Sequence, residues 1–293
     1  MINSAKALFI AVRIRTLVAS IAPVLIGSAL SYSYGLFSIT IFLYTLLAAI
    51  FIQIGTNFAN DVYDYLMGAD NEDRVGPSRA VQSNLISVKK MKALTIISFS
   101  LAILCGLPLV FKGGLPILMI GLLSIISGYL YTAGPYPLGY NGWGDIFVFC
   151  FFGPIAVCGT YYLQNDIVSF YSLMMGIVLG SLSTSLLCVN NVRDTDTDRL
   201  AGKRTLAVRV SPNFVRMMFS TLLLSSYLIS VYVAHSLSIS IIFLSIFVLM
   251  IYPCIRMIVD IYSLQGSDLN RLLSKVSNYI LVYSVVFIFS VVI

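Results

Sequence analysis

The sequence is poor in charge: only 10% of its 293 residues are charged, against about 25% in a typical soluble domain. It has one histidine, His235, and no CxxC pair among its five cysteines. These shortages argue strongly against a histidine-based metal centre or a Ser-His-Asp triad, and they give no support to a zinc site or a disulfide framework. The first apolar stretch is too long for a signal peptide core and shows no cleavage site, so we expect it to remain as a membrane span.

Apolar residues fill most of what is left. They make up 59% of the chain, and runs of about 20 of them recur along its whole length, each long enough to cross a bilayer as a helix. The sequence therefore predicts an all-α polytopic membrane protein, built as one transmembrane domain over residues 1–293. We expect nine transmembrane helices, at 14–34, 38–59, 93–111, 114–132, 145–163, 168–189, 214–234, 237–258 and 273–293.

The basic residues sort by side in this arrangement. Of the 18 lysines and arginines, 17 fall before the first span or in the connections on that same side, and only Lys112 falls on the other. Because basic residues favour the cytoplasmic side, the N-terminus is predicted to be cytoplasmic and the C-terminus to lie outside. The net charge of +6 is thus a topology signal, and no nucleic-acid partner is expected.

The first polar segment, residues 57–81, begins where the second span ends. It reads NFANDVYDYLMGADNEDRVGPSRAV and holds five acidic residues. If the helix continues, Asn57, Asp61 and Asp64 lie on one of its faces, with Asn60 beside them. Such an oxygen-rich face suits a hard cation such as Mg²⁺, which binds through carboxylates and substrate phosphate oxygens.

A second polar segment, residues 190–210, repeats the order of the first. Asn190, Asp194 and Asp198 are spaced by four, Asn191 stands next to them, and glycine and basic residues follow in NNVRDTDTDRLAGKRTLAVRV. The two segments form a weak internal repeat. One such loop could be a charged surface only, but two at span ends favour a paired site, since charge at a membrane boundary is costly unless it is paired or bound.

Two facing acidic clusters suggest more than one Mg²⁺, with a diphosphate held between them. Arg79, Lys203 and Arg204 would donate charge-assisted hydrogen bonds to that diphosphate. Metal and arginine stabilise the charge on a departing phosphate group, and aromatic faces stabilise a carbocation left behind on an allylic lipid chain.

These motifs resemble those of the UbiA superfamily of intramembrane aromatic prenyltransferases. The pair NDVYD (60–64) and NNVRDTDTD (190–198) carries the resemblance. RVGPSRAV (74–81), FFGPIAVCGTYYLQ (151–164) and VRIRTLVASIAPVLIG (12–27) are most similar to the menaquinone-pathway branch, the 1,4-dihydroxy-2-naphthoate polyprenyltransferases. The resemblance implies nine helices around a central cavity in the cytoplasmic (inner) membrane, with the active site facing the cytoplasm. It implies transfer of a polyprenyl chain from its diphosphate to the naphthoate with loss of CO₂, giving demethylmenaquinone.

The resemblance also implies roles for individual residues. Catalysis and Mg²⁺ binding would fall to the acidic residues together with one asparagine: Asn57, Asp61, Asp64, Asp194 and Asp198. Substrate contacts would come from Asn57, Asn60, Arg79, Asn190, Asn191, Lys203 and Arg204. The sequence departs from the family at Gly68, where many members have a third aspartate, and at Ile14, where a proline is common. The roles of Asp70, Asp196, Arg13 and Arg15 stay open.

Two alternatives remain at this stage. The same chemistry could use another acceptor, such as 4-hydroxybenzoate or homogentisate. A cation-coupled membrane transporter would belong to a different class, but its polar site should lie near the bilayer midplane, whereas these carboxylates gather at span ends. Within the fifth span, Gly153-Pro154 is a candidate break, and Asp145 is expected to cap that span's first turn.

Overall fold

The computed structural model of the protein describes residues 4–71 and 74–292, and every regular element in them is helical. Eight helices in these ranges are long and apolar enough to cross a membrane. They are α2 (Ile14–Ser33), α3 (Ile39–Leu66), α4 (Val88–Leu130), Gly144–Asn165, α7 (Phe170–Arg193), α10 (Pro212–Ser236), Ile241–Ser263 and Gly266–Val292. The prediction of an all-α polytopic protein is confirmed.

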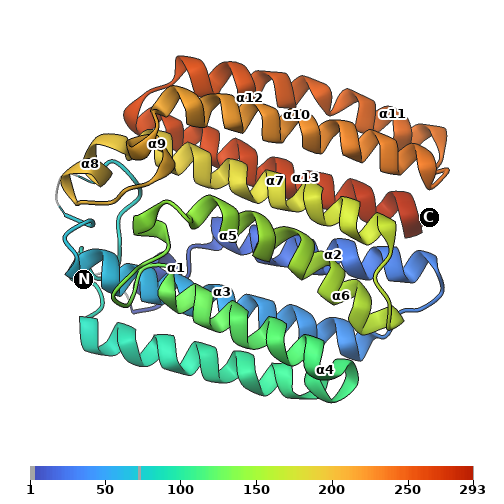
Figure 1. The fold of residues 1–293 in the computed structure, drawn as a ribbon, viewed down its shortest axis with the longest axis horizontal. Helices are drawn as coiled ribbons and strands as arrows, with labels where there is room; N and C mark the ends of the chain where they lie inside the picture. Colours follow the sequence, from blue (N-terminus) through green and yellow to red (C-terminus); the bar gives the residue numbers. More distant parts are fainter. Residues whose placement is uncertain (1–3, 72–73, 293) are drawn as a thin grey trace.

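The helix α4 accounts for two of the nine predicted spans. Inside it, Gly114 has φ 64° and ψ −151°, which breaks the helix between the predicted spans 93–111 and 114–132. Lys92, near its start, lies 5.7 Å from the Tyr63 ring, and the Tyr129 hydroxyl, near its end, lies 2.6 Å from the Tyr63 hydroxyl. A straight helix would separate these ends by about 55 Å. The chain therefore folds back at Gly114, as Figure 1 shows. The count of nine spans and the side of the N-terminus stay predictions.

Three of the spans are made of shorter pieces. Gly144–Asn165 combines α5 (Gly144–Cys150), the π-helical turn η2 (Phe151–Ile155) and α6 (Ala156–Asn165). Ile241–Ser263 combines α11 (Ile241–Leu249) and α12 (Ile251–Ser263), and Gly266–Val292 combines the 3₁₀ turn η3 (Gly266–Asp268) and α13 (Leu269–Val292). Short helices occupy the polar connections: α1 (Ser4–Val12), η1 (Gly139–Asn141), α8 (Thr195–Leu200) and α9 (Leu206–Arg209).

The predicted break at Gly153-Pro154 is confirmed. Gly153 has non-helical backbone angles, φ −120° and ψ −107°, inside η2. A Cβ atom at Gly153 would lie 2.4 Å from the carbonyl oxygen of Gly176, and one at Gly180 would lie 2.6 Å from that of Phe149. These glycines let the backbones of the broken span and α7 touch, which fixes where α5 turns toward the cavity.

The helices run roughly along one axis of the molecule (Figure 1). α7 lies at the centre and packs against α2, α5, η2, α10 and α13, and its side chains form much of the main apolar core. The N-terminal residues, α8 and α9 lie at one end of the bundle, and the C-terminus lies at the other. Both acidic segments are therefore at the same end.

Candidate active site

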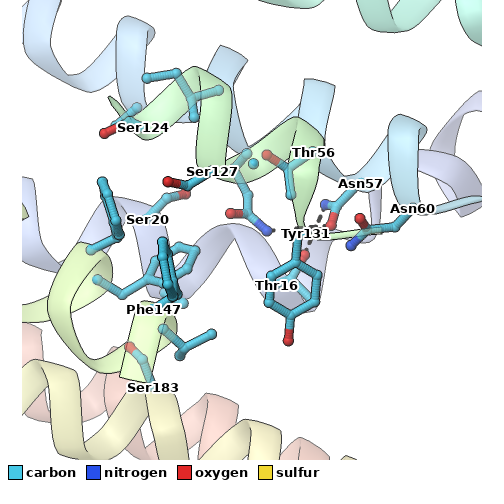
Figure 2. A pocket seen from close by; sticks show the side chains of 18 of the residues that line it. Thr16, Ser20, Thr56, Asn57, Asn60, Ser124, Ser127, Tyr131, Phe147 and Ser183 are labelled. Carbon is cyan, nitrogen blue, oxygen red and sulfur yellow. Dashed lines mark hydrogen bonds between the residues drawn. The ribbon is translucent and has the colours of Figure 1, made fainter. Parts of the chain in front are cut away.

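A cavity of about 960 Å³ runs between the helices, lined by residues of α2, α3, α4, α5, η2, α6, α7 and α8. Its body is apolar, with side chains such as Ile52, Leu109, Ile117 and Phe147. One end of the cavity, its polar end, is lined by polar and charged residues from both acidic segments. Figure 2 shows the tyrosine ring of Tyr131 projecting into this space. The arrangement suits a ligand with a charged head and an apolar tail.

The first acidic segment lies on the last turns of α3, which continues to Leu66, past the predicted end at residue 59. Asn57, Asn60 and Asp64 line the cavity. The buried Asp64 carboxylate accepts a hydrogen bond from the Tyr140 hydroxyl at 2.8 Å and lies 2.9 Å from the Lys203 ammonium. The helix continues as the prediction of one face for Asn57, Asp61 and Asp64 requires, and of these three residues Asn57 and Asp64 line the cavity.

Asp61, on the same face, has different partners. Its carboxylate is fully buried and accepts hydrogen bonds from the backbone N–H groups of Ala80 and Val81, both at 3.1 Å. It is not among the residues that line the cavity. A carboxylate bonded to two backbone donors anchors the loop, so Asp61 fixes the position of the adjoining Arg79.

The two asparagines of the first segment are also bonded within the protein. The Asn57 amide donates to the Val12 carbonyl at 2.8 Å and to the Thr16 hydroxyl at 2.9 Å, and its oxygen accepts from Gln53 at 3.3 Å. The Asn60 oxygen accepts from the Thr132 hydroxyl at 2.8 Å. Figure 2 shows Asn57, Asn60 and Thr16 together on one wall.

The second acidic segment does not form one continuous helix. α7 ends at Arg193, Asp194 has φ −97° and ψ 10°, and α8 begins at Thr195. Backbone hydrogen bonds still link Asp194 to Asn190 and Asp198 to Asp194, at 2.9 and 2.7 Å. Because that spacing survives the bend, Asn190, Asp194 and Asp198 all line the cavity.

Each polar residue of this segment has a distinct neighbour. Asp194 pairs with the buried Arg193 guanidinium through two hydrogen bonds of 2.7 and 2.6 Å. Asn191 donates to Asp145, in the first turn of α5, at 3.4 Å. Asp196 is exposed at the surface, which separates it from the cavity-facing acids.

Lys203 joins the two segments. Its ammonium lies 2.9 Å from Asp64 and 4.0 Å from Asp198, and 4.6 Å from the centre of the Tyr140 ring. Burial acts to lower the pKa of Lys203, but attraction by Asp64 and Asp198 outweighs it and raises the pKa. Burial raises the pKa of Asp198 to about 6, and repulsion by Asp194 and Asp64 adds to this while Lys203 opposes it.

The residue after Lys203 behaves differently. Arg204 is exposed and is not among the cavity-lining residues, and its backbone N–H donates to the Tyr140 carbonyl at 2.7 Å. That hydrogen bond ties the second acidic segment to η1.

Arg74 and Arg79 line the cavity from the loop that follows α3. The buried Asp70 carboxylate forms a short ion pair with Arg74, and its other oxygen lies 3.3 Å from Nε of Arg79, poorly aligned for a hydrogen bond. Burial lowers the pKa of Arg79 to about 9, helped by the nearby Arg13 and Arg74. Glu72 and Asp73 of this stretch lie outside the described residues.

Two tyrosines belong to the site, and the sequence pointed to Tyr131 as an aromatic residue near a cytoplasmic span end but not to Tyr140. Tyr140 lies in η1 and reaches Asp64 and Lys203, and Tyr131 follows α4. Cβ atoms at Gly139 and Gly144 would lie within 2.9 Å of the Tyr131 side chain, so the two glycines make room for its ring. The glycines of PLGYNGWGD were the only sequence signal that this connection packs closely.

No group of three or more His, Cys, Asp or Glu side chains in the described ranges is arranged to hold a metal ion. The donor set nevertheless suits Mg²⁺. Asp64 and Asp198 bracket a positive charge, that of Lys203, and the neighbouring donors are carboxylate and amide oxygens, which hard cations prefer. The same polar end carries the guanidinium groups of Arg79 and Arg193, which suit a phosphate ligand.

Comparisons with known proteins identify the family and the fold. The UbiA prenyltransferase family matches the chain over residues 20–279. The 1,4-dihydroxy-2-naphthoate octaprenyltransferase of Mycobacterium tuberculosis is 39% identical over 72% of each chain, and that of Haemophilus influenzae is 34% identical over 94% of this chain and 92% of its own. The structure of a UbiA homolog from Archaeoglobus fulgidus bound to DMAPP and Mg²⁺ is 17% identical and superposes with a TM-score of 0.69 over 97% of this chain and 98% of its own.

The family match and the apolar helices make the chain an integral membrane protein. The resemblance predicted from the two acidic segments is confirmed, and the chain belongs to the UbiA prenyltransferase family.

Proposed function

We propose that the protein transfers a polyprenyl group from polyprenyl diphosphate to 1,4-dihydroxy-2-naphthoate, with loss of CO₂, to give demethylmenaquinone in its quinol form. The observation that carries the proposal is the cavity, which has a volume of about 960 Å³. Its polar end is lined by residues of both acidic segments, and its body is apolar. The choice of acceptor rests on the relatives, two of which are named for this reaction at 34–39% identity.

The chain's charged residues would hold the diphosphate. Asp64, Asp194 and Asp198 line the polar end and would bind Mg²⁺ through their carboxylates, and Asn57 and Asp61 are the further ligands that the sequence predicts. Bound Mg²⁺ would neutralise the negative charge that develops on the departing diphosphate. Lys203 and Arg79 would donate hydrogen bonds to the diphosphate oxygens, while Asn60, Asn190, Asn191 and Arg204 stay predicted substrate contacts.

The apolar body would take the prenyl chain and exclude water. Phe147 and Phe151 line it with rings stacked 5.9 Å apart at an interplanar angle of 11°. Their π-faces stabilise positive charge on an allylic carbon as its C–O bond breaks. The electron pair of that bond leaves with the diphosphate, a ring carbon of the acceptor forms the new C–C bond, and the carboxylate leaves as CO₂ while the ring keeps its bonding electrons.

We place the protein in the cytoplasmic membrane with this site facing the cytoplasm, because the predicted basic side of the topology coincides with the polar end of the cavity. A transporter would need its acidic residues near the midplane, but here they lie at the ends of α3 and α7. The weak repeat of segments 57–81 and 190–210 would then supply the two halves of one diphosphate site within a single domain.

The test is a turnover assay on purified protein in lipid, with geranylgeranyl diphosphate, 1,4-dihydroxy-2-naphthoate and Mg²⁺, and with EDTA as the metal-free control. We expect metal-dependent formation of the prenylated quinol and stoichiometric CO₂. Product with 4-hydroxybenzoate or homogentisate and none with the naphthoate would reassign the acceptor. No product with any of the three acceptors from folded protein would reject the enzyme class.

A further inference from the structure

One buried cation at the cavity has no partner. Arg13 stands between α1 and α2 and lines the polar end. Its Nε and Nη2 atoms are buried, and neither makes a hydrogen bond to any described residue. A buried polar group without a partner is costly to the fold, so a buried guanidinium with two vacant donors points to a ligand.

The other cations of this end are already paired. Arg74 and Arg79 have Asp70, Arg193 has Asp194 at 2.6 Å, and Lys203 has Asp64 at 2.9 Å. Arg15 also lines the cavity, but it is exposed and can be hydrated. Among the cations of the described cavity wall, Arg13 is thus the one that combines buried, unbonded guanidinium nitrogens with no carboxylate oxygen within 4.0 Å; the Nε of Arg79 is also unbonded, but it lies 3.3 Å from Asp70.

The backbone, and not an ion pair, holds Arg13 in place. Its φ of 55° and ψ of 65° are left-handed, a conformation that residues other than glycine adopt rarely. The Arg13 carbonyl accepts from the hydroxyl and the N–H of Thr16. Asn57 donates to that hydroxyl (Figure 2) and to the Val12 carbonyl. Asn57 of α3 therefore fixes the turn from which the Arg13 side chain enters the cavity.

The two vacant donors define the kind of ligand. Nε–H and Nη2–H lie on one edge of the planar guanidinium, the edge that binds both oxygens of a carboxylate or phosphate. Burial lowers the pKa of Arg13, with Asp61 and Asp70 opposing the shift, yet an arginine stays charged in proteins. An anion at this edge would restore the stabilisation that burial removes.

We infer that Arg13 binds the carboxylate of the aromatic acceptor, with Asn57 as the residue that positions it. The inference rests on the proposed function, in which two anionic groups enter the cavity. The diphosphate has Lys203 and the vacant Nε of Arg79 beside the two acidic segments, whereas Arg13 offers the carboxylate two vacant donors on one edge. A bidentate grip would keep the carboxylate ionised, the form that leaves as CO₂, and would fix which ring carbon faces the allylic chain.

The experiment measures equilibrium binding in EDTA to protein in nanodiscs, so that turnover plays no part. The probes are 1,4-dihydroxy-2-naphthoate, its carboxylate-free analogue 1,4-dihydroxynaphthalene, and geranyl diphosphate. The variants are Arg13→Gln, Arg13→Lys and the matched control Arg256→Gln, which removes an exposed guanidinium outside the cavity.

We expect Arg13→Gln to weaken naphthoate binding about 10- to 100-fold, the worth of charge-assisted hydrogen bonds, and to leave the carboxylate-free analogue unchanged. Arg13→Lys keeps the charge and the fold but lacks the bidentate edge, so it should lose less. Asn57→Ala should weaken naphthoate binding in the same direction.

Three results would overturn the inference. Naphthoate binding equal to wild type in folded Arg13→Gln and Arg13→Lys would show that Arg13 does not bind the carboxylate. Loss of geranyl diphosphate binding instead would assign the edge to a phosphate. If wild-type protein bound geranyl diphosphate but no naphthoate, the proposed acceptor would fall together with this inference.

Discussion

The two acidic segments share a sequence pattern but not a backbone. In the first, α3 runs unbroken through Asn57, Asp61 and Asp64. In the second, the helix bends at Asp194 and resumes as α8. In both segments the helix ends two residues before a left-handed glycine, Gly68 with φ 75° and Gly202 with φ 73°.

Their acids are also used differently. Among the described acids of the first segment, Asp61 bonds its own loop and Asp64 alone lines the cavity, whereas in the second Asp194 and Asp198 line it. Lys203 from the second then reaches Asp64 of the first. The comparison teaches that two copies of a motif can have different roles. The first copy holds a loop in place through Asp61, and the second supplies Lys203, the cation that joins the two segments.

Asp64→Asn should have the largest effect on activity. Asp64 is the first-segment carboxylate at the junction, and asparagine keeps its shape without its charge. We expect kcat/KM to fall about 100- to 1000-fold, a loss typical of removing one group that stabilises the transition state. The matched control is Asp166→Asn at the opposite end of the bundle. Asp166 is exposed, and asparagine tolerates the left-handed backbone conformation at that position. A decrease in kcat/KM of less than 10-fold would show that the Asp64 carboxylate does not stabilise the transition state.

Lys203→Met should break the junction in metal-free protein. It leaves Asp64 and Asp198 without their shared cation, which should cost about 3 kcal/mol of stability. If Mg²⁺ takes over that charge, adding it should recover most of the loss. Thermal unfolding with EDTA or Mg²⁺ measures this, with Lys275→Met in the exposed pair with Asp260 as control. An equal loss in both conditions would argue that Mg²⁺ does not bind between the segments.

Asp61→Asn tests whether the first segment holds its loop as described. One of the two backbone donors, Ala80 or Val81, should lose its acceptor, so we expect a loss of about 1–3 kcal/mol. Hydrogen exchange at these two amides should speed up, while Mg²⁺ affinity should change less than in Asp64→Asn. If Mg²⁺ affinity fell as far as in Asp64→Asn, Asp61 would be a metal ligand, as its sequence position predicts.

Gly68→Ala and Gly202→Ala should have the smallest effects and should match each other. No atom lies within 4 Å of a Cβ at either position, so only the left-handed backbone is penalised, at about 1 kcal/mol each. Chemical denaturation of both variants measures the pair. If the losses of unfolding free energy in the two variants differed by more than about 1 kcal/mol, the helix ends at Gly68 and Gly202 would not be equivalent.

Much of the fold follows from the sequence, because apolar runs report which stretches avoid water. The predicted spans correspond to observed helices, and the predicted boundary between spans 93–111 and 114–132 coincides with the break of α4 at Gly114. The predicted span 38–59 ends before α3 does, since Asp61 and Asp64 are too polar for an apolar run, but the helix continues through them to Leu66. They stay helical because other elements bury them and bond their side chains.

The sequence indicated which residue types line the cavity better than it indicated which residues they bond to. Helical spacing brings Asn57, Asp64, Asp194 and Asp198 to the cavity wall. That Asp61 bonds the backbone at 80–81, or that Tyr140 contacts both segments, depends on how distant loops fold. No local pattern encodes such contacts.

The fold-back at Gly114 has a consequence for how the protein presents itself to the two compartments. At that end of the bundle the chain turns over within a few residues, at Tyr34–Ser38, Gly114, Asp166–Ser169 and Leu237–Ser240. Lys112, paired with Asp166, is the one lysine in or beside these turns. An amine-reactive reagent or a trypsin-like protease confined to that side of a membrane would meet almost no target, while the opposite side carries the long loops and the other lysines. For lysine-directed reagents, almost all of the reactive sites are thus on one side of the membrane.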